Sequence, residues 1–145
     1  MRVVGRSGSR YDILVVDDQE PMRLLLAQIL AQELKVEVTL AGTCEKALRL
    51  ADEKVFDLIL LDLLMPGIGG FEVLKRIRAG SANKSTPVIV VSVLGASIMD
   101  EDEIVSLGRA TALGANAVVS KPFTRAALMT AVREQLRIND SQSQH

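Results

Sequence analysis

Short apolar runs alternate with longer amphipathic segments along most of the chain. Runs rich in Val, Ile and Leu, bounded by polar or turn residues, predict buried strands at 12–17, 37–41, 57–62, 87–92 and 117–120. Between and after them, apolar residues at helical spacing predict helices at 21–34, 43–53, 71–79, 100–113 and 124–136. The pattern therefore predicts five strand-then-helix units in succession.

Local signals support several of the helix boundaries. Pro21 suits a first helical turn, where no backbone N–H is needed. Thr43 and Thr124 each precede a helical pattern and can cap it. Asp100 and Glu103 have the spacing of a capping box. The helix starts indicated by these residues agree with those indicated by the spacing of the apolar residues.

The predicted strands are apolar on both faces, which indicates a parallel sheet covered by helices on both sides. In such doubly wound α/β sheets, sites form beyond the carboxyl ends of the strands, at a topological switch point. The residues to examine are therefore those that end or follow strands. Polar or charged residues occupy these positions after four of the five strands: Asp17, Asp18, Asp62, Ser92 and Lys121.

Three carboxylates brought together repel one another, and one of them would stay protonated without a counter-charge. A hard divalent cation such as Mg²⁺, with oxygen ligands, is the usual resolution. Lys121 would add a second positive charge and Ser92 a hydroxyl donor. Such a set of groups suits phosphoryl transfer, in which a carboxylate can act as the nucleophile and form an acyl phosphate.

Each of these residues also has a purely structural interpretation. Asp17 and Asp18 could cap the first helix, and Asp62 before a Pro/Gly turn could form that turn. Ser92 and Lys121 could be ordinary strand-end and loop residues. On the structural interpretation, four strand ends would each carry a residue suited to phosphoryl transfer by coincidence. We therefore favour the interpretation that these residues form a single phosphoryl site.

Length, composition and charge narrow the class of protein. The chain has 145 residues, enough for one domain, and its net charge of −1 provides no basic field for nucleic acid. No apolar run is long enough to span a bilayer. Cys44 is expected to be a packing residue in a reducing compartment, and His145 a solvated terminal residue. We expect a cytoplasmic domain at 11–137, with flexible ends at 1–10 and 138–145.

The strand-end motifs resemble the marker positions of the response-regulator receiver family of two-component signalling. The resemblance covers residues 11–136. It is carried by Asp17-Asp18 after ILVV, Asp62 in LDLLMPG, Ser92 in VIVVS, and Lys121-Pro122-Phe123. It implies a flavodoxin-like fold of five parallel strands in the order 2-1-3-4-5 with five helices.

The resemblance also implies a role for each matching residue. Asp62 would accept a phosphoryl group from a histidine kinase or a histidine phosphotransfer protein. Mg²⁺ (or Mn²⁺) would be bound by Asp18 and Asp62, by Asp17 largely through water, and by the backbone carbonyl of Leu64. Ser92 and Lys121 would hold phosphoryl oxygens. The Lys121–Pro122 bond would be cis and would direct the Lys121 side chain toward the site.

By the same resemblance the chain is a signalling phosphoacceptor, and the only reactions it would catalyse are its own phosphorylation and dephosphorylation. Its output would be a change in partner binding at the face of the fourth helix, fifth strand and fifth helix. A second copy of the chain is a further implied partner, in a dimer that forms on phosphorylation. Neither nucleic acid nor a membrane is an expected partner of this chain by itself.

The sequence departs from the family pattern at several positions. Val118 stands where the family usually has the Tyr or Phe that moves on activation, and Val93 where a small Ala is common. The segment 94–102 adds roughly two helical turns' worth of residues. Gly69 stands where Asp, Asn or Ser often caps the third helix. Leu64 and Leu94, beside the site, are apolar and cannot orient a water, which predicts a long-lived acyl phosphate.

Other functions remain to be weighed against this one. A flavodoxin-type FMN protein needs phosphate donors in its first loop, whereas the acidic residues after the first strand would repel a phosphate. A haloacid-dehalogenase-like phosphatase needs a second acid two residues after its nucleophile, where Leu64 stands. The chain could also be a receiver from a hybrid kinase or longer regulator, or an interaction module that works without phosphorylation.

Overall fold

The computed structural model describes residues 2–4, 11–93 and 108–137. Six strands form one sheet in the order β1-β3-β2-β4-β5-β6. All but β1 run parallel, and numbered among themselves they follow the predicted order 2-1-3-4-5. The parallel strands are β2 (Tyr11–Val16), β3 (Val36–Ala41), β4 (Leu58–Leu61), β5 (Val88–Val93) and β6 (Ala117–Lys121).

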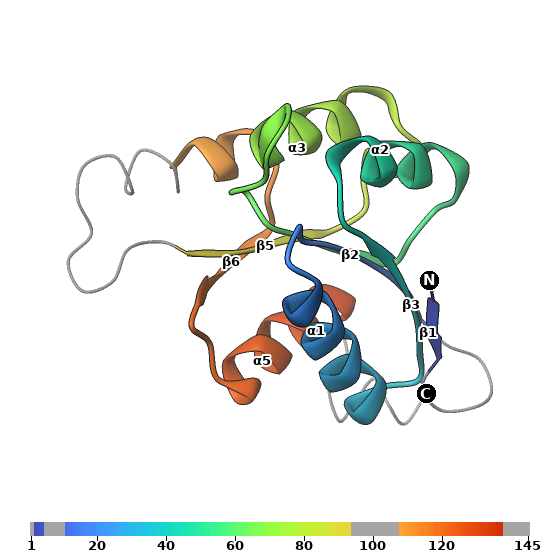
Figure 1. Cartoon of the computed structure of the whole chain (residues 1–145), viewed down its shortest axis with the longest axis vertical. Helices are drawn as coiled ribbons and strands as arrows, with labels where there is room; N and C mark the ends of the chain where they lie inside the picture. The colour runs from blue at the N-terminus through green and yellow to red at the C-terminus, as the bar shows by residue number, and fades with distance from the viewer. Residues whose placement is uncertain (1, 5–10, 94–107, 138–145) are drawn as a thin grey trace.

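Helices cover both faces of this sheet. They are α1 (Glu20–Glu33), α2 (Cys44–Glu53), α3 (Gly69–Gly80) and α5 (Arg125–Leu136), and residues 108–112 are also helical. Figure 1 shows α1 and α5 on one face and α2 and α3 on the other. The doubly wound α/β arrangement predicted from the apolar strands is therefore confirmed.

The alternation of side chains along β2 explains why its run from Ile13 to Val16 is apolar throughout. Ile13 and Val15 pack in a cluster with α1 and α5, whereas Leu14 and Val16 pack in a second cluster with α2 and α3. All four are at most 1% exposed. Burying each such side chain contributes about 1.5–3 kcal/mol, so the two clusters hold the strands rigidly beneath the loops that follow them.

Capping residues mark the helix starts as predicted. The hydroxyl of Thr43 accepts a hydrogen bond from the Lys46 N–H at 3.1 Å, and that of Thr124 accepts one from the Ala127 N–H at 3.0 Å. Pro21 lies in the first turn of α1. Local sequence chemistry therefore predicts where these three helices begin.

The amino-terminal segment differs from the prediction of a flexible arm at 1–10. Residues Arg2–Val4 form β1, which pairs antiparallel with β3 in the register Val3↔Val38. This strand covers the edge of β3 that would otherwise expose unpaired backbone groups. The predictions for 94–102 and for the tail at 138–145 lie outside the described residues.

The start of α3 also differs from the prediction that Gly69 acts as its cap. The helix begins at Gly69 itself, Ile68 is the capping residue, and no side chain caps the first turn. Gly69 has φ = +85°, in the region that side-chain-bearing residues rarely adopt. Glycine is needed at this position for its backbone conformation.

Candidate functional site

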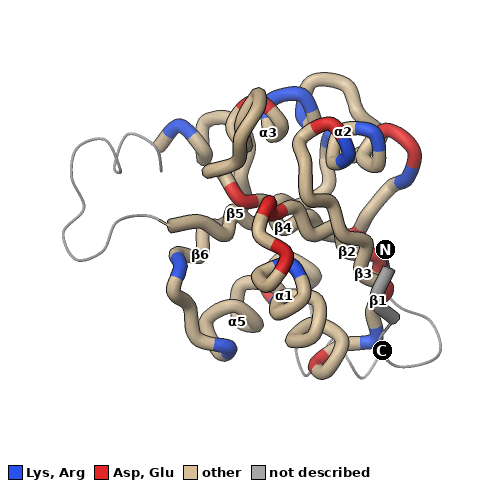
Figure 2. The backbone as a smooth tube through the Cα atoms, viewed as in Figure 1, with Lys and Arg blue, Asp and Glu red and all other residues tan. Residues whose placement is uncertain are grey.

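Three carboxylates meet at the carboxyl ends of β2 and β4. These neighbouring strands end in register, with Val16 opposite Leu61. Asp17 and Asp18 follow β2 and Asp62 follows β4, and one carboxylate oxygen of each lies within 4.8 Å of the others. Figure 2 shows acidic residues gathered where these loops leave the sheet between α1 and α3.

The carboxylate of Asp62 is held in one orientation by its neighbours. Its Oδ1 accepts hydrogen bonds from the Leu64 N–H at 3.0 Å and from the Ser92 hydroxyl at 2.9 Å. Its Oδ2 lies 3.5 Å from the Lys121 ammonium. The residue is 5% exposed. Oδ1 is therefore anchored, while Oδ2 is the oxygen that faces the positive charge of the site.

Asp17 is the partner that positions Lys121. Its Oδ2 accepts from the Lys121 ammonium at 2.6 Å, and its Oδ1 accepts from the Gln19 N–H at 2.9 Å. Asp17 is 1% exposed, whereas Asp18 is partly exposed. Lys121 thus bridges two buried carboxylates, and Asp18 presents the acid that is most accessible to solvent.

Burial raises the pKa of Asp62 above its ordinary value. The Leu64 N–H, the Ser92 hydroxyl and the Lys121 ammonium oppose this rise, and the nearby charge of Asp17 adds to it. Three carboxylates and one ammonium leave a formal charge of two negatives at the site. This balance and the all-oxygen donor set fit a hard divalent cation.

The structure brings together every side chain that the sequence predicted for the site. Ser92 and Lys121 come from the ends of β5 and β6, and both reach Asp62. The Lys121–Pro122 peptide bond is cis, as the resemblance implied. Leu64 reaches the site through its N–H, and the role of its carbonyl stays a prediction.

Gly70 is a positioning residue that the sequence prediction missed. A Cβ at this position would lie 2.4 Å from the Asp62 carbonyl oxygen and 2.4 Å from the Leu63 Cα. The Gly70 N–H also donates to the Leu63 carbonyl at 3.1 Å. The first turn of α3 therefore packs directly against the backbone that carries Asp62, and glycine allows this approach.

Besides Gly69, three of the unusual positions lie in the described structure: Leu64, Val93 and Val118. Leu64 and Val93 flank the site with side chains that are 62% and 53% exposed. Val118 is partly buried and packs against a small cluster formed by Leu63, Val90 and Ala110. Apolar surface therefore lies beside Asp62, and a branched aliphatic side chain occupies the position where the family has an aromatic ring. The variable residue Leu94 lies outside the described residues.

The fold and the site define a flavodoxin-like α/β protein with an acidic cluster at its topological switch point. The family model described as the response regulator receiver domain matches residues 13–133. The chain therefore belongs to the response regulator receiver family, whose members act in two-component signalling.

Individual relatives agree with this assignment. The "Uncharacterized transcriptional regulatory protein YkoG" of Bacillus subtilis (strain 168) is 34% identical over 135 residues, which cover 91% of this chain and 54% of that protein. The "Probable chemotaxis protein CheY" of Rhizobium etli is 32% identical, covering 85% of this chain and 90% of that protein.

A solved structure resembles the fold closely. The receiver domain of sensor histidine kinase PA1611 from Pseudomonas aeruginosa PAO1, with a magnesium ion coordinated in its active-site cleft, has a TM-score of 0.75 and 25% identity. The match covers 90% of this chain and 100% of that one.

Two further observations bear on the chain as a whole. It spans about half the length of the first curated relatives it matches. Among the helices that the structure describes, none combines the length and the apolar character needed to cross a bilayer.

Proposed function

We propose that the chain is a phosphoryl-accepting receiver in which Asp62 takes the phosphoryl group. The observation that carries this proposal is the setting of the Asp62 carboxylate. One of its oxygens is anchored by two hydrogen bonds, and the other faces Lys121 beside two further acids. A buried turn-forming aspartate does not need these additional charged partners.

In the proposed reaction, Asp62 Oδ2 attacks the phosphorus of a phosphohistidine. A new O–P bond forms as the P–N bond breaks, and its electron pair leaves on the imidazole nitrogen of the donor. The product is an acyl phosphate on Asp62. The Leu64 N–H and the Ser92 hydroxyl hold the carboxylate before attack. Ser92 and Lys121 would then hold oxygens of the transferring phosphoryl group, where Lys121 neutralises charge.

A divalent cation, Mg²⁺ or Mn²⁺, would be held by Asp17, Asp18, Asp62 and the Leu64 carbonyl. When bound it would supply positive charge to the phosphoryl oxygens. The three clustered carboxylates and the magnesium found in the similar receiver from Pseudomonas aeruginosa support this assignment.

The partners follow from the same proposal. The phosphoryl donor would be a histidine kinase or a histidine phosphotransfer protein. The output surface would be the face formed by the helix at 108–112, β6 and α5. A phosphorylation-dependent dimer would be a further assembly of the chain. The chain matches only about half the length of the first curated relatives, two of which are named as transcriptional regulatory proteins, so a receiver module of a longer regulator is a second candidate.

Phosphorylation by a small donor tests the proposal directly. Incubation with Mg²⁺ and acetyl phosphate or phosphoramidate is expected to add one phosphate, measured by intact-mass spectrometry. Asp62→Asn should abolish the addition, because the amide keeps the hydrogen-bond acceptor but is not a nucleophile. Asp57→Asn is the matched control and should be labelled like the wild type.

The control is informative because Asp57 lies at the other end of β4. Its carboxylate accepts a hydrogen bond from the Asp12 N–H at 2.7 Å, away from the acidic cluster. If the wild type stays unmodified under conditions that label an ordinary receiver, the proposal is wrong. The chain would then be an interaction module that works without phosphorylation.

A further inference from the structure

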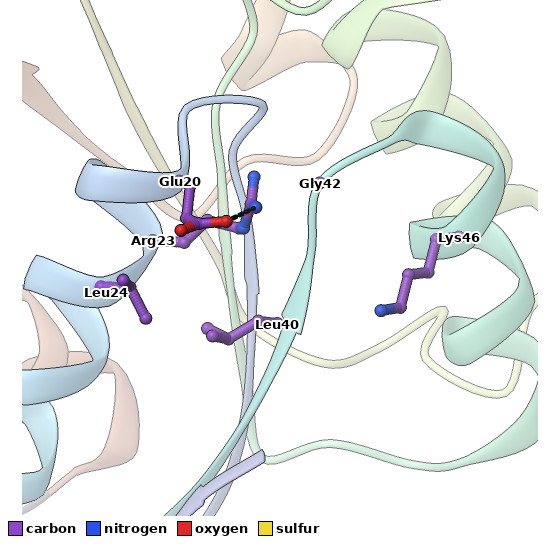
Figure 3. A pocket seen from close by; sticks show the side chains of 6 residues that line it. All are labelled: Glu20, Arg23, Leu24, Leu40, Gly42 and Lys46. Carbon is purple, nitrogen blue, oxygen red and sulfur yellow. Dashed lines mark ion pairs between the residues drawn. The ribbon is translucent and has the colours of Figure 1, made fainter. Parts of the chain in front are cut away.

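A small pocket of about 210 Å³ lies beside the acidic cluster, between the first turns of α1, the end of β3 and the start of α2. Figure 3 shows Arg23 extending from α1 toward Gly42, with Glu20 at its side. The lining residues are Glu20, Arg23, Leu24, Leu40, Gly42 and Lys46. The position of the Arg23 guanidinium is the feature of this pocket that bears on the site.

Arg23 holds the backbone between the two acids that follow β2. Its Nη1 donates to the Asp17 carbonyl at 2.7 Å, and that carbonyl belongs to the peptide joining Asp17 to Asp18. Its Nη2 lies 3.9 Å from the Glu20 carboxylate. The Arg23 side chain is 17% exposed, whereas that of Glu20 is 75% exposed. The short contact to the Asp17 carbonyl is therefore the better-protected of the two.

Gly42 leaves the space that the guanidinium occupies. A Cβ at position 42 would lie 2.7 Å from Arg23 Nη1 and 3.0 Å from its Cζ. The atoms in the way are the far end of a flexible side chain, so a substitution here would displace Arg23 with little cost to the backbone. Gly42→Ala therefore moves the guanidinium without removing its charge.

We propose that Arg23 is a positioning residue for the cation site, and that Gly42 is the position that permits it. By holding the peptide between Asp17 and Asp18, Arg23 orients both carboxylates toward the cation. The inference rests on the cation binding of the proposed function. It assigns a role in metal affinity to two residues outside the acidic cluster.

Removing Arg23 would change the Mg²⁺ affinity in opposite directions if it acted through its charge or through positioning. A measured affinity therefore distinguishes the two roles. A guanidinium near a cation repels it, and its removal by charge alone would strengthen binding. Loss of a group that orients metal ligands weakens binding, typically by about 10–100-fold. A weaker site after removal of Arg23 therefore indicates positioning.

The experiment is a Mg²⁺ titration by calorimetry on the wild-type chain and its variants. Arg23→Met and Gly42→Ala are each expected to weaken Mg²⁺ binding by about tenfold. The double variant should be little weaker than either, because both changes remove the same contact. Arg23→Lys, which keeps the charge but loses the planar fork, should also bind more weakly than the wild type.

Two matched controls should bind Mg²⁺ like the wild type. Arg49→Met removes a positive charge from α2, where Arg49 pairs with Glu53 at 3.9 Å on the exposed surface. Gly80→Ala adds a methyl group at the end of α3, where nothing lies within 4 Å of the new Cβ. Melting temperatures without Mg²⁺ report whether each variant is folded.

The outcomes distinguish the inference from the function on which it rests. A wild-type chain that binds no Mg²⁺ overturns the cation site itself. A wild type that binds, together with a folded Arg23→Met that binds equally or more tightly, overturns the positioning role. If Arg23→Met does not fold, the Mg²⁺ affinities of Arg23→Lys and Gly42→Ala replace it, and wild-type or tighter binding by both overturns the positioning role. Unchanged affinity in Gly42→Ala with a weaker Arg23→Met overturns the role of Gly42.

Discussion

Among individual residues, the side chain of Leu64 has the clearest consequence for the chemistry at Asp62. Its N–H donates to the Asp62 carboxylate, but its side chain is apolar and 62% exposed beside the site. Hydrolysis of an acyl phosphate proceeds by attack of a water in line with the phosphorus, and a polar side chain beside the site speeds this step by orienting the water. Leu64 provides no such group.

The phosphorylated chain is therefore expected to be long-lived in Mg²⁺ when no phosphatase is present. Leu64→Asn should shorten the lifetime several-fold, because an amide can orient the attacking water. The decay of the phosphorylated mass with time measures both. Leu25→Asn, on α1 and 43% exposed, is a control that should leave the lifetime unchanged. A wild-type half-life of seconds would contradict the expectation.

Between elements, Arg78 joins the end of α3 to the loops that lead into β5 and β6. Its guanidinium donates to the Gly114 carbonyl at 2.8 Å and to the Thr86 carbonyl at 2.6 Å. It also reaches the Asn116 side chain at 2.9 Å. Burial lowers the pKa of Arg78. Gly114 has φ = +107°, and a Cβ there would lie 2.8 Å from Arg78 Nε.

Arg78→Met is expected to lower the free energy of unfolding by about 2–4 kcal/mol. The reason is that several carbonyls that now accept from Arg78 would lose their donor in a partly buried setting. Chemical denaturation measures the change. Arg76→Met is the control, because Arg76 is exposed and its partner Glu72 lies 2.9 Å away on the same helix.

This control variant should change stability by no more than about 0.5 kcal/mol. Equal losses in the Arg78 and Arg76 variants would show that Arg78 does not hold the loops together.

Across the whole molecule, the first and last helices of the described fold are joined on one face of the sheet. Glu33 near the end of α1 pairs with Arg125 at 2.8 Å and with Arg133 at 3.4 Å, both on α5. The hydrogen bond from Arg125 is the main cause of a lowered pKa for Glu33. Because the folded-state pKa is depressed, the ion pairs stabilise the fold above the ordinary pKa of 4.5.

This stabilising contribution should be lost as the pH falls through the lowered pKa of Glu33. Glu33→Gln is therefore expected to lower the melting temperature slightly at neutral pH and to have less effect in acid. Thermal unfolding across a pH series measures the difference. Glu53→Gln removes an exposed acid that pairs within α2 at 3.9 Å, and it is the control. A difference between Glu33→Gln and the wild type that does not shrink in acid would contradict this linkage.

Most of the architecture could be predicted from the amino-acid sequence, because strands and helices follow from local periodicity. Apolar runs predicted the parallel strands, and Thr43 and Thr124 predicted two helix starts. The sequence also indicated the composition of the candidate site, because parallel strands bring their carboxyl ends to one edge. Asp17, Asp62 and Lys121 meet there for that reason.

The contacts that hold this site in place arise from the packing of segments that lie far apart in the sequence. The pairing of β1 with β3 depends on a strand more than thirty residues away along the chain. The approach of Gly70 to the Asp62 backbone depends on how α3 packs, and that of Gly42 to Arg23 on how β3 lies against α1. Close approaches of this kind have no periodicity in the sequence, because they arise from the distances between packed elements.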